Sequence, residues 1–270
     1  MSQELGIKYT KSGGEMKMNS RKLFTTKKAV VFLLICFMIT LIGCSDNGGE
    51  EPDDGYLEIE INNGEGTITN YDVETAKEEL GEEDALNFII PSEEAGVEIT
   101  VIGEEAFSGK GLTAVNFSGD NVEKINDGAF SNNKLTLVEI PDSVIEIGEG
   151  VFSNNELESL KISEGIIKIS SAAFIGNELK SVEISDSVKE IGGSAFNDNE
   201  LTSVEIPAGV EEIGKFAFWQ NENLEEVNMP AEVNLKGDII STGAFKEVYE
   251  ENDEEAGTYK LINDEWVLEE

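Results

Sequence analysis

Carboxylates are the only abundant side chains in this sequence that could carry out chemistry. The chain of 270 residues holds 56 Asp and Glu, no histidine and two cysteines. Two carboxylates at a suitable separation can hydrolyse glycosides, one as the acid and the other as the base or nucleophile. One of the two then needs an apolar setting that raises its pKa, and no pair of acids here lies in such a stretch. We therefore expect no enzyme and no cofactor.

The missing histidines and the two cysteines exclude further classes of site. Ser-His-Asp triads and the histidine-ligated zinc sites of proteases and carbonic anhydrases are impossible here. A disulfide framework is excluded as well, because Cys36 and Cys44 are the only cysteines.

An acidic cluster near the carboxyl end suggests a calcium site, because carboxylates suit a hard cation. The cluster comprises Glu250, Glu251, Asp253, Glu254 and Glu255. Its spacing matches neither an EF-hand loop nor an Asp-rich nonapeptide repeat, which favours simple solvation of the charges. We therefore expect no bound metal, and a thermal melt unchanged by millimolar calcium would agree with that expectation.

Cys44 follows a segment typical of bacterial export. Residues 17–28 contain five basic side chains, and residues 29–42 are apolar apart from Thr40. A run of 14 residues is too short for a bilayer-spanning helix and fits the apolar region of a signal peptide. The run leads into Leu-Ile-Gly-Cys, which resembles the lipobox, in which the cysteine is lipid-modified and becomes the first mature residue.

These features predict a signal peptide over residues 1–44 and lipidation of Cys44. An uncleaved anchor helix is the alternative, with nearly the same topology. Met16 and Met18 are alternative start sites, because either would begin a more ordinary signal. Residues 45–55 are acidic and rich in glycine, which predicts a flexible tether. We expect the protein to be exported and lipid-anchored to the outer face of the bacterial cell membrane, or to lie at the cell surface.

The balance of charge excludes nucleic acid as a partner. The chain has 19 basic residues and a net charge of −37, and residues 1–44 hold seven of the basic and two of the acidic residues. The remainder carries 12 basic against 54 acidic residues, a net charge of −42. Nucleic-acid binding needs a basic surface. Partners are instead expected to be basic or bound through cations, with association that weakens as salt rises.

An aromatic marker recurs along the middle of the chain. The marker positions are Phe107, Phe130, Phe152, Phe174, Phe196, Phe218 and Phe245. The intervals are 23, 22, 22, 22, 22 and 27 residues, and alanine precedes every marker except one, where Val151 replaces it. Each unit has about eight apolar positions, too few for a core of its own, so successive units must stack as the coils of a solenoid.

A strand is predicted in each coil. Leu-x-x-Val-x-Ile follows most markers by five residues, as in Leu135, Val138 and Ile140. The Val-x-Ile alternation points two side chains inward, and such strands would form a parallel sheet with a spacing of about 4.8 Å. Asparagines recur two residues before the strand leucine, and we expect their amides to bond backbone groups of the turns in a ladder. They are Asn133, Asn155, Asn177 and Asn199.

The repeating pattern resembles the BspA-like bacterial surface leucine-rich repeat. The shared motif is I-P-x-x-V-x-x-I-G-x-x-A-F-x-x-N-x-L-x-x-V-x-I, seen in Ile206-Pro207, Val210, Ile213-Gly214 and Ala217-Phe218. The resemblance covers residues 99–245. It implies an α/β-type solenoid that is mostly β, built from leucine-rich repeats of 22–23 residues, with a parallel sheet on one face and β-rich end caps. It also implies an exported surface protein that binds other macromolecules without catalysis.

The departures from this motif are local. Ser163 stands where proline is expected, Ser170 and Ser171 replace the glycine site, and residues 224–245 are lengthened, which predicts an insertion. A catalytic site should appear as a break in the register, and residues 221–245 are the only sizeable break. That break holds no paired acids in an apolar setting.

Caps are predicted at both ends of the solenoid, which we place at residues 99–246, because a bare terminal coil would expose apolar surface. The amino-terminal cap, residues 56–98, reads as two strands around a turn at residues 62–64, then a short helix and a strand at residues 86–90. Asp72 is the predicted N-cap of that helix, which runs to Leu80 and is closed by Gly81.

The carboxyl-terminal cap, residues 247–270, reads as a β-hairpin. Tyr259 and Trp266 flank its predicted turn at Asn263-Asp264. Their rings are expected to cover the last coil, and a ligand platform is the alternative.

The outward side chains of the predicted sheet are the candidate partner-binding site, because solenoids present extended faces. The candidates are Thr136, Leu137, Glu139, Glu158, Lys161, Lys180, Glu183, Thr202 and Glu205. Glu139, Lys161 and Glu183 alternate in sign, so neighbouring side chains should attract weakly. The face has no aromatic cluster and no arginine, so a merely solvated surface is the competing interpretation.

Together these features predict a lipid-anchored cell-surface leucine-rich repeat protein that mediates protein–protein interaction or adhesion through the sheet face. The expected partner is an extracellular or surface protein, and the membrane is contacted through the lipid anchor only. The alternatives are a structural envelope lipoprotein with no dedicated ligand and a carbohydrate-acting enzyme.

Overall fold

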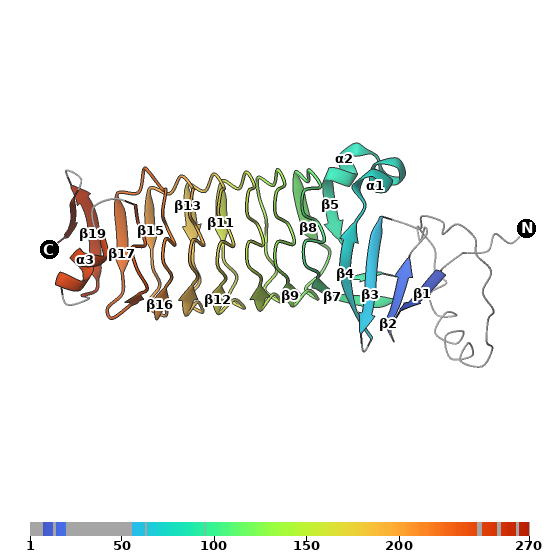
Figure 1. Ribbon diagram of the computed structural model, residues 1–270, viewed down its shortest axis with the longest axis horizontal. Helices are drawn as coiled ribbons and strands as arrows, with labels where there is room; N and C mark the ends of the chain where they lie inside the picture. Colours follow the sequence, from blue (N-terminus) through green and yellow to red (C-terminus); the bar gives the residue numbers. More distant parts are fainter. Residues whose placement is uncertain are drawn as a thin grey trace, which may run out of the picture.

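The computed structural model is a rod of stacked coils closed by a cap at each end (Figure 1). It describes residues 8–12, 15–19, 56–62, 64–94, 96–241, 245–252, 255–262 and 265–269. Cys44, the tether at residues 45–55 and most of the predicted signal peptide lie outside these ranges. The signal peptide and the lipid anchor therefore stay predictions.

Successive coils contribute short strands to a first ladder along one side of the rod (Figure 1). Its strands are β8 (Ala114–Phe117), β11 (Ser159–Lys161), β13 (Ser181–Glu183), β15 (Ser203–Glu205) and β17 (Glu226–Met229). The pairs β11–β13 and β15–β17 are parallel, as the sequence predicts. Alternation within each strand explains this arrangement, since Leu160 is buried between the exposed side chains of Ser159 and Lys161.

A second ladder runs along the opposite side of the rod, and the sequence analysis does not predict it. Its strands are β9 (Lys124–Ile125), β10 (Glu146–Ile147), β12 (Lys168–Ile169), β14 (Glu190–Ile191), β16 (Glu212–Ile213) and β18 (Asn234–Leu235). Each strand has two residues, and the pairs β9–β10, β12–β14, β14–β16 and β16–β18 are parallel. Two residues are too few for an alternating pattern to stand out in the sequence.

The core between the ladders is a column of stacked phenylalanine rings. Adjacent rings from Phe107 to Phe218 lie 5.1–5.7 Å apart between centroids, with planes inclined by 5–17°. All six marker rings of this column are at most 1% exposed. The stack explains why the aromatic marker repeats at the period of one coil, because each ring needs a copy above and below it.

The last coil corrects one prediction. No insertion lengthens residues 224–245, because Phe218 N donates to Ile239 O at 2.9 Å, just as Phe196 N donates to Ala217 O at 2.7 Å. Ile239 and Ile240 thus take the places of the Ala-Phe pair, 22 residues after Ala217 and Phe218. Both isoleucines are buried. The seventh marker, Phe245, belongs to the carboxyl-terminal cap instead.

The amino-terminal cap continues both ladders. Its elements are β3 (Leu57–Asn62), β4 (Glu65–Tyr71), α1 (Val73–Leu80), α2 (Glu82–Leu86), β5 (Asn87–Ile90), β6 (Glu93–Glu94) and β7 (Val97–Ile102). β5 pairs in parallel with β8 of the first ladder, and β7 pairs in parallel with β9 of the second. Two further strands, β1 (Lys8–Ser12) and β2 (Glu15–Asn19), extend the sheet beyond β3 and fall within the predicted signal segment.

The predicted helix of this cap is confirmed as α1, with Asp72 at its N-cap and Gly81 at its C-cap. The Asp72 carboxylate accepts hydrogen bonds from Glu74 N at 3.0 Å, Thr75 N at 3.2 Å and Thr75 Oγ1 at 2.7 Å. These bonds, the one from the Thr75 side chain foremost, lower the pKa of Asp72 below its ordinary value.

The carboxyl-terminal cap is a helix and a hairpin over the last coil. The hairpin strands are β19 (Gly257–Ile262) and β20 (Glu265–Leu268), and the predicted turn between them lies outside the described residues. α3 (Phe245–Glu251) is not predicted from the sequence. The rings of Tyr259 and Trp266 are at most 2% exposed and contact Phe245, with centroids 5.5 and 5.1 Å away. Both rings belong to the buried core, and Tyr259 lies opposite Val227 of β17, the last strand of the first ladder, as a cap over the last coil requires.

Within the described ranges, the structure holds no helix with the length and apolar character needed to cross a membrane.

Candidate partner-binding face

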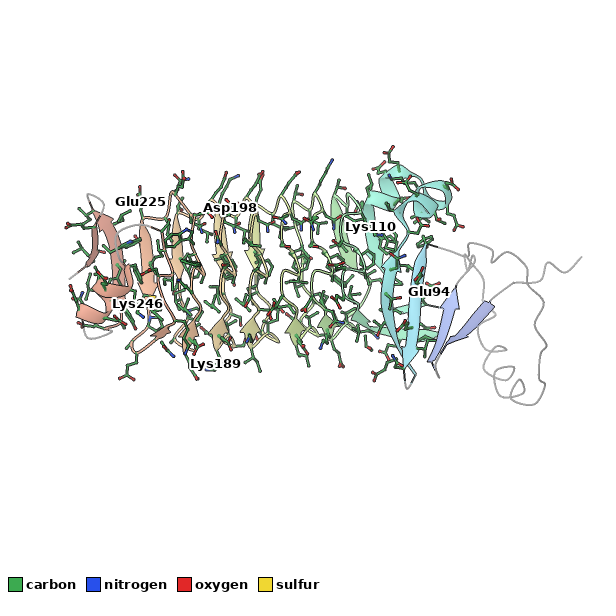
Figure 2. The ribbon with its side chains drawn as sticks, viewed as in Figure 1. Glu94, Lys110, Lys189, Asp198, Glu225 and Lys246 are labelled. Atoms are coloured by element: carbon green, nitrogen blue, oxygen red, sulfur yellow. The ribbon has the colours of Figure 1, made fainter. Side chains whose placement is uncertain are left out.

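We use the term partner face for the outward side chains of the first ladder, of the coil segment 136–140 that precedes β11, and of the residue directly before each of the strands β11, β13, β15 and β17. All nine candidates from the sequence analysis lie on it and are exposed. They are Thr136, Leu137, Glu139, Glu158, Lys161, Lys180, Glu183, Thr202 and Glu205. Figure 2 shows Glu225 at this side of the rod and Lys189 projecting from the opposite side, so both ladders turn charged side chains to solvent.

Buried asparagines hold the turns that precede segment 136–140 and the later strands of this face, β11, β13, β15 and β17. The Asn155 Oδ1 atom accepts from Leu135 N at 3.1 Å, while its Nδ2 donates to the carbonyl oxygens of Phe130 and Phe152 at 3.0 and 3.1 Å. Asn133, Asn177 and Asn199 likewise bond the turn backbone of their own and neighbouring coils, which confirms the predicted ladder. A fifth member, Asn221, was not predicted because its leucine follows after three residues instead of two. One amide thus sets the height of each strand relative to the next.

Two ion pairs join coils across the partner face. Lys161 Nζ lies 3.2 Å from Glu183 Oε1, and Lys180 Nζ lies 3.5 Å from Glu158 Oε2. All four side chains are more than half exposed, so each pair contributes at most about 1 kcal/mol. Of the predicted alternation Glu139–Lys161–Glu183, the Lys161–Glu183 contact is present as an ion pair.

The first ladder is interrupted between residues 137–140 and β11. β11 and β13 form a sheet of two strands, and Val138 is bridged to Val115 of the preceding coil. Figure 1 shows the coil between β8 and β11 without a strand arrow on this side. β13 and β15 likewise belong to separate sheets, so the pair β11–β13 is not joined to the strands on either side of it.

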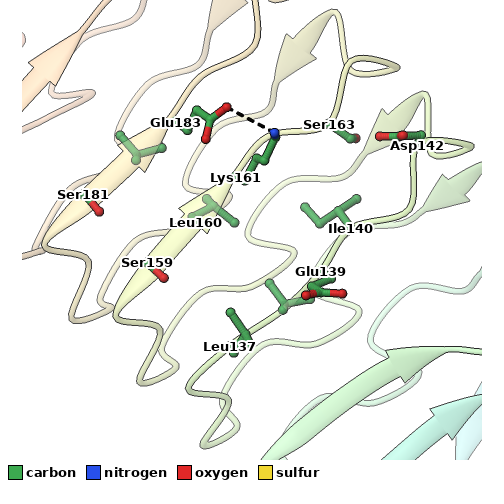
Figure 3. A pocket seen from close by; sticks show the side chains of 12 residues that line it. Leu137, Glu139, Ile140, Asp142, Ser159, Leu160, Lys161, Ser163, Ser181 and Glu183 are labelled. Atoms are coloured by element: carbon green, nitrogen blue, oxygen red, sulfur yellow. Dashed lines mark ion pairs between the residues drawn. The ribbon is translucent and has the colours of Figure 1, made fainter.

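A hollow of about 520 Å³ lies over this interruption and is lined by three successive coils (Figure 3). Leu137, Val138, Ile140, Leu160 and Val182 supply its apolar part. Glu139, Asp142, Lys161, Glu183, Ser159, Ser163 and Ser181 are its polar lining residues, and the Oγ atom of Ser163 is itself buried. The mixture of apolar surface with a few polar groups is the usual composition of a binding site.

Four of the nine predicted residues line the hollow, namely Leu137, Glu139, Lys161 and Glu183. The others lie outside it on the same face. Asp142 and Ser163 line the hollow and were missed as site residues. The signal for Ser163 is present in the sequence, because serine replaces the proline of the motif at that position.

The lining of the hollow supplies carboxylates and one ammonium group, which bind ligands through charge and hydrogen bonds. Among the residues that the structure describes, no group of three or more Asp, Glu, Cys or His side chains is arranged to hold a metal ion. Two members of the acidic cluster considered for calcium, Asp253 and Glu254, lie outside the described ranges. Three carboxylates and a single ammonium group leave the hollow with negative charge.

Comparison with known families identifies the repeat. The family model described as BspA type leucine rich repeat region, in six copies, matches residues 87–200 and 145–250. These ranges include the segment 136–140, β11 and β13, which line the hollow. No curated protein matches the chain.

Several solved structures are similar to this chain. A leucine rich cell surface protein from Faecalibacterium prausnitzii is 20% identical over 83% of this chain, with a TM-score of 0.46, and the match spans 59% of that protein. The leucine rich repeat protein of T. pallidum is 23% identical over 67% of this chain and 83% of its own, with a TM-score of 0.48. A leucine-rich repeat protein from Bacteroides ovatus is 15% identical over 89% of this chain and 67% of its own, with a TM-score of 0.40.

Proposed function

The chain belongs to the BspA-type leucine-rich repeat family, and from that premise we propose that it is a non-catalytic protein-binding module of the bacterial cell surface. The partner face is the binding surface. The protein is held to the membrane by lipid on Cys44, and residues 45–55 separate the solenoid from the anchor.

One observation carries this proposal, namely the hollow that three coils form on the partner face. Side chains of the partner face stand at fixed spacing because the asparagine ladder and the phenylalanine stack hold every coil in register. A rigid surface loses little conformational entropy on binding, which favours recognition by complementarity. The hollow adds buried contact area in the middle of that surface, where binding energy is usually concentrated.

The negative charge of the molecule favours basic partners. Residues after Cys44 carry a net charge of −42, so basic proteins approach faster and bind more tightly at low salt than neutral ones. Contacts bridged by cations serve the same purpose for an acidic or neutral partner. In either case association weakens as the ionic strength rises.

A capture experiment tests the proposal. The full chain, purified in detergent from the membrane fraction of an expressing bacterium, is incubated with surface extracts at low and at high salt. We expect a protein partner that is retained at low salt and lost at high salt. The double variant Glu183→Lys, Glu205→Lys reverses charge on the partner face and should lose the partner.

The matched control is the double variant Glu123→Lys, Glu211→Lys, which makes the same change of charge beside the second ladder, where both side chains are exposed. It should keep the partner if the partner face is the site. Equal loss in both variants would mean that net charge alone holds the partner. Capture of no partner at all would favour a structural envelope role, and the binding proposal would be dropped.

A further inference from the structure

The buried hydroxyl of Ser163 stands without a hydrogen-bond partner. Its Oγ atom is enclosed, the residue is 4% exposed, and it lines the hollow next to Asp142 in Figure 3. A buried hydroxyl without a partner is unfavourable, so native structures rarely keep one unless a water or a ligand satisfies it. Ser163 is therefore a polar group in need of a partner at the wall of a binding site.

The next coil shows that the sequence can satisfy a serine at this position. Ser185 is the equivalent residue there, and its Oγ accepts from Ser187 N at 3.3 Å and pairs with Ser187 Oγ at 2.9 Å. In the coil of Ser163 the place of Ser187 is taken by Gly165. A Cβ atom on Gly165 would lie only 2.6 Å from Val144 O, so no side chain fits at this point. Ser163 therefore lacks the hydrogen-bond partner that Ser185 has, because no side chain fits at Gly165.

The charges around Ser163 favour a cationic ligand. Lys161 is occupied by its ion pair with Glu183. Glu139 and Asp142 also line the hollow, and among the described residues neither forms an ion pair with a lysine. Two carboxylates and one unpaired hydroxyl oxygen are acceptors, and a ligand that brings several donors would satisfy all three.

The apolar part of the hollow favours a ligand with an aliphatic stem. The Leu137 side chain is 53% exposed, and Leu160 and Val182 lie in the two coils that follow it. An aliphatic chain that lies against Leu137 removes this exposed apolar surface from water, and that burial favours binding.

We propose that the hollow receives an arginine side chain of the protein partner, an inference that rests on the proposed role of the partner face in binding protein. The aliphatic stem lies against Leu137 and Leu160. The guanidinium group donates to the carboxylates of Asp142 and Glu139 and to Ser163 Oγ, which turns toward the hollow by rotation about χ1. Arginine suits this site better than lysine, because its planar group carries five donors and is more weakly hydrated than an ammonium group.

Three blocked peptides test this assignment without the natural partner. Acetyl-Gly-Arg-Gly-amide, its lysine analogue and its citrulline analogue are titrated into the full chain at 150 mM salt, about the physiological ionic strength, and binding is followed through the leucine methyl NMR signals. We expect the arginine peptide to bind about tenfold more tightly than the other two, because they lack either the fork of donors or the charge. Ser163→Pro and Asp142→Asn should each weaken the arginine peptide about tenfold.

Two variants serve as matched controls. Ser185→Pro makes the same substitution one coil later, outside the hollow, and Glu211→Gln removes one charge from an exposed side chain beside the second ladder. Both should leave the affinity for the arginine peptide within about twofold. Ser163→Pro restores the residue found at Pro141 and Pro207 and should fold, and Ser163→Ala removes the hydroxyl alone as a second check.

Equal affinities for the arginine and lysine peptides would overturn the assignment, as would arginine binding that Ser163→Pro, Ser163→Ala and Asp142→Asn leave unchanged. A captured partner that is lost with Glu183→Lys, Glu205→Lys but kept by the Ser163 and Asp142 variants would preserve the proposed function and reject the arginine site. Arginine-selective peptide binding without any captured partner would support the site and reject the proposed function.

Discussion

Single residues decide how one coil attaches to the next. Each buried asparagine bonds backbone groups of two coils, so its amide performs a task that no apolar residue of similar size could perform. The sequence predicts this role because the asparagines keep a fixed place two residues before the strand leucine. Their partners in the neighbouring coil could not be named until the register of the coils was known.

The substitution Asn155→Ala should lower the free energy of unfolding by about 2–3 kcal/mol. It leaves Leu135 N without its acceptor and removes the donor to the carbonyls of Phe130 and Phe152, all of them buried. Urea denaturation followed by circular dichroism measures the change. Glu156→Ala, an exposed neighbour, is the control and should change the stability by less than about 0.5 kcal/mol. An equally small effect of Asn155→Ala would contradict the proposed role.

A second residue-scale feature is a column of left-handed backbone positions. Gly128, Gly150, Ala172, Ser194 and Phe216 occupy the same place in successive coils, with φ between 55° and 65°. Only glycine adopts this conformation without strain, because it lacks Cβ. The left-handed backbone thus favours glycine at this position, but three of these five coils have alanine, serine or phenylalanine there.

Ala172→Gly should therefore raise the free energy of unfolding by about 0.5–1 kcal/mol, and Gly150→Ala should lower it by a similar amount. A Cβ atom on Gly150 would lie 3.4 Å from Ser153 Oγ, an ordinary contact, so backbone conformation rather than crowding decides the sign. The two variants change adjacent coils in opposite directions, and chemical denaturation compares them directly. Changes of the same sign in both would show that left-handed strain is not the cause.

At the scale of elements, what could be predicted from the sequence depends on the length of the pattern. The helix α1 was predicted because it carries recognisable signals at both ends, Asp72 before it and Gly81 after it. The strands of the second ladder were not predicted because they have two residues each. The helix α3 was not predicted because it begins with Phe245, which the sequence pattern assigns to the repeat. The interval of 27 residues suggested an insertion, whereas Ile239 and Ile240 keep the register in place of Ala-Phe.

The N-cap of α1 makes the stability of the amino-terminal cap depend on pH. Hydrogen bonds lower the pKa of Asp72 in the folded chain, so its carboxylate stabilises the fold fully above the unfolded pKa of about 3.9. This contribution is lost as the pH falls through the lower, folded-state pKa. Asp72→Ala should therefore cost about 1 kcal/mol at pH 7 and little at pH 2.

Urea denaturation of the native chain and of Asp72→Ala between pH 7 and pH 2 measures this difference. Glu74→Ala controls for the general loss of an acid in the first turn of the helix. A difference between Asp72→Ala and the native chain that persists unchanged at low pH would mean that the carboxylate charge is not what stabilises the helix.

The site could be predicted only in part, because it depends on how elements combine. All nine candidate residues are exposed as expected. Alternation explains this for Leu137, Glu139, Lys161, Glu183 and Glu205, whereas Thr136, Glu158, Lys180 and Thr202 lie one residue before the alternating positions. The hollow arises where residues 137–140 fail to join β11 in one ladder, which no property of a single strand indicates. Asp142 and Ser163 line the hollow although neither belongs to the predicted outward columns.

At the scale of the whole molecule, repulsion among carboxylates opposes folding. The residues after Cys44 carry a net charge of −42, whereas the ion pairs on the described surface are exposed and individually weak. Screening by salt should therefore reduce the repulsion between carboxylates more than it weakens these ion pairs, and the folded state should become more stable. Sodium chloride raised from about 0.02 M to about 0.5 M should increase Tm by about 5 °C.

A thermal melt followed by circular dichroism at several salt concentrations measures this effect. Sucrose at matched osmolarity serves as the control, since it does not screen charge. A Tm that falls with salt would show that the exposed ion pairs outweigh the repulsion.

The stacking of coils also makes this molecule a ruler. Each coil of 22 residues advances the rod by one strand spacing, about 4.8 Å, although the same residues fully extended would reach about 70 Å. The length of the rod thus grows in equal steps of one coil, and the asparagine and phenylalanine columns repeat at the same step. Duplication or loss of one whole coil between the amino-terminal cap and Leu137 would move the hollow along the rod by one strand spacing, about 4.8 Å, and leave its lining intact. The distance at which a partner is held could then be adjusted without redesign of the surface that holds it.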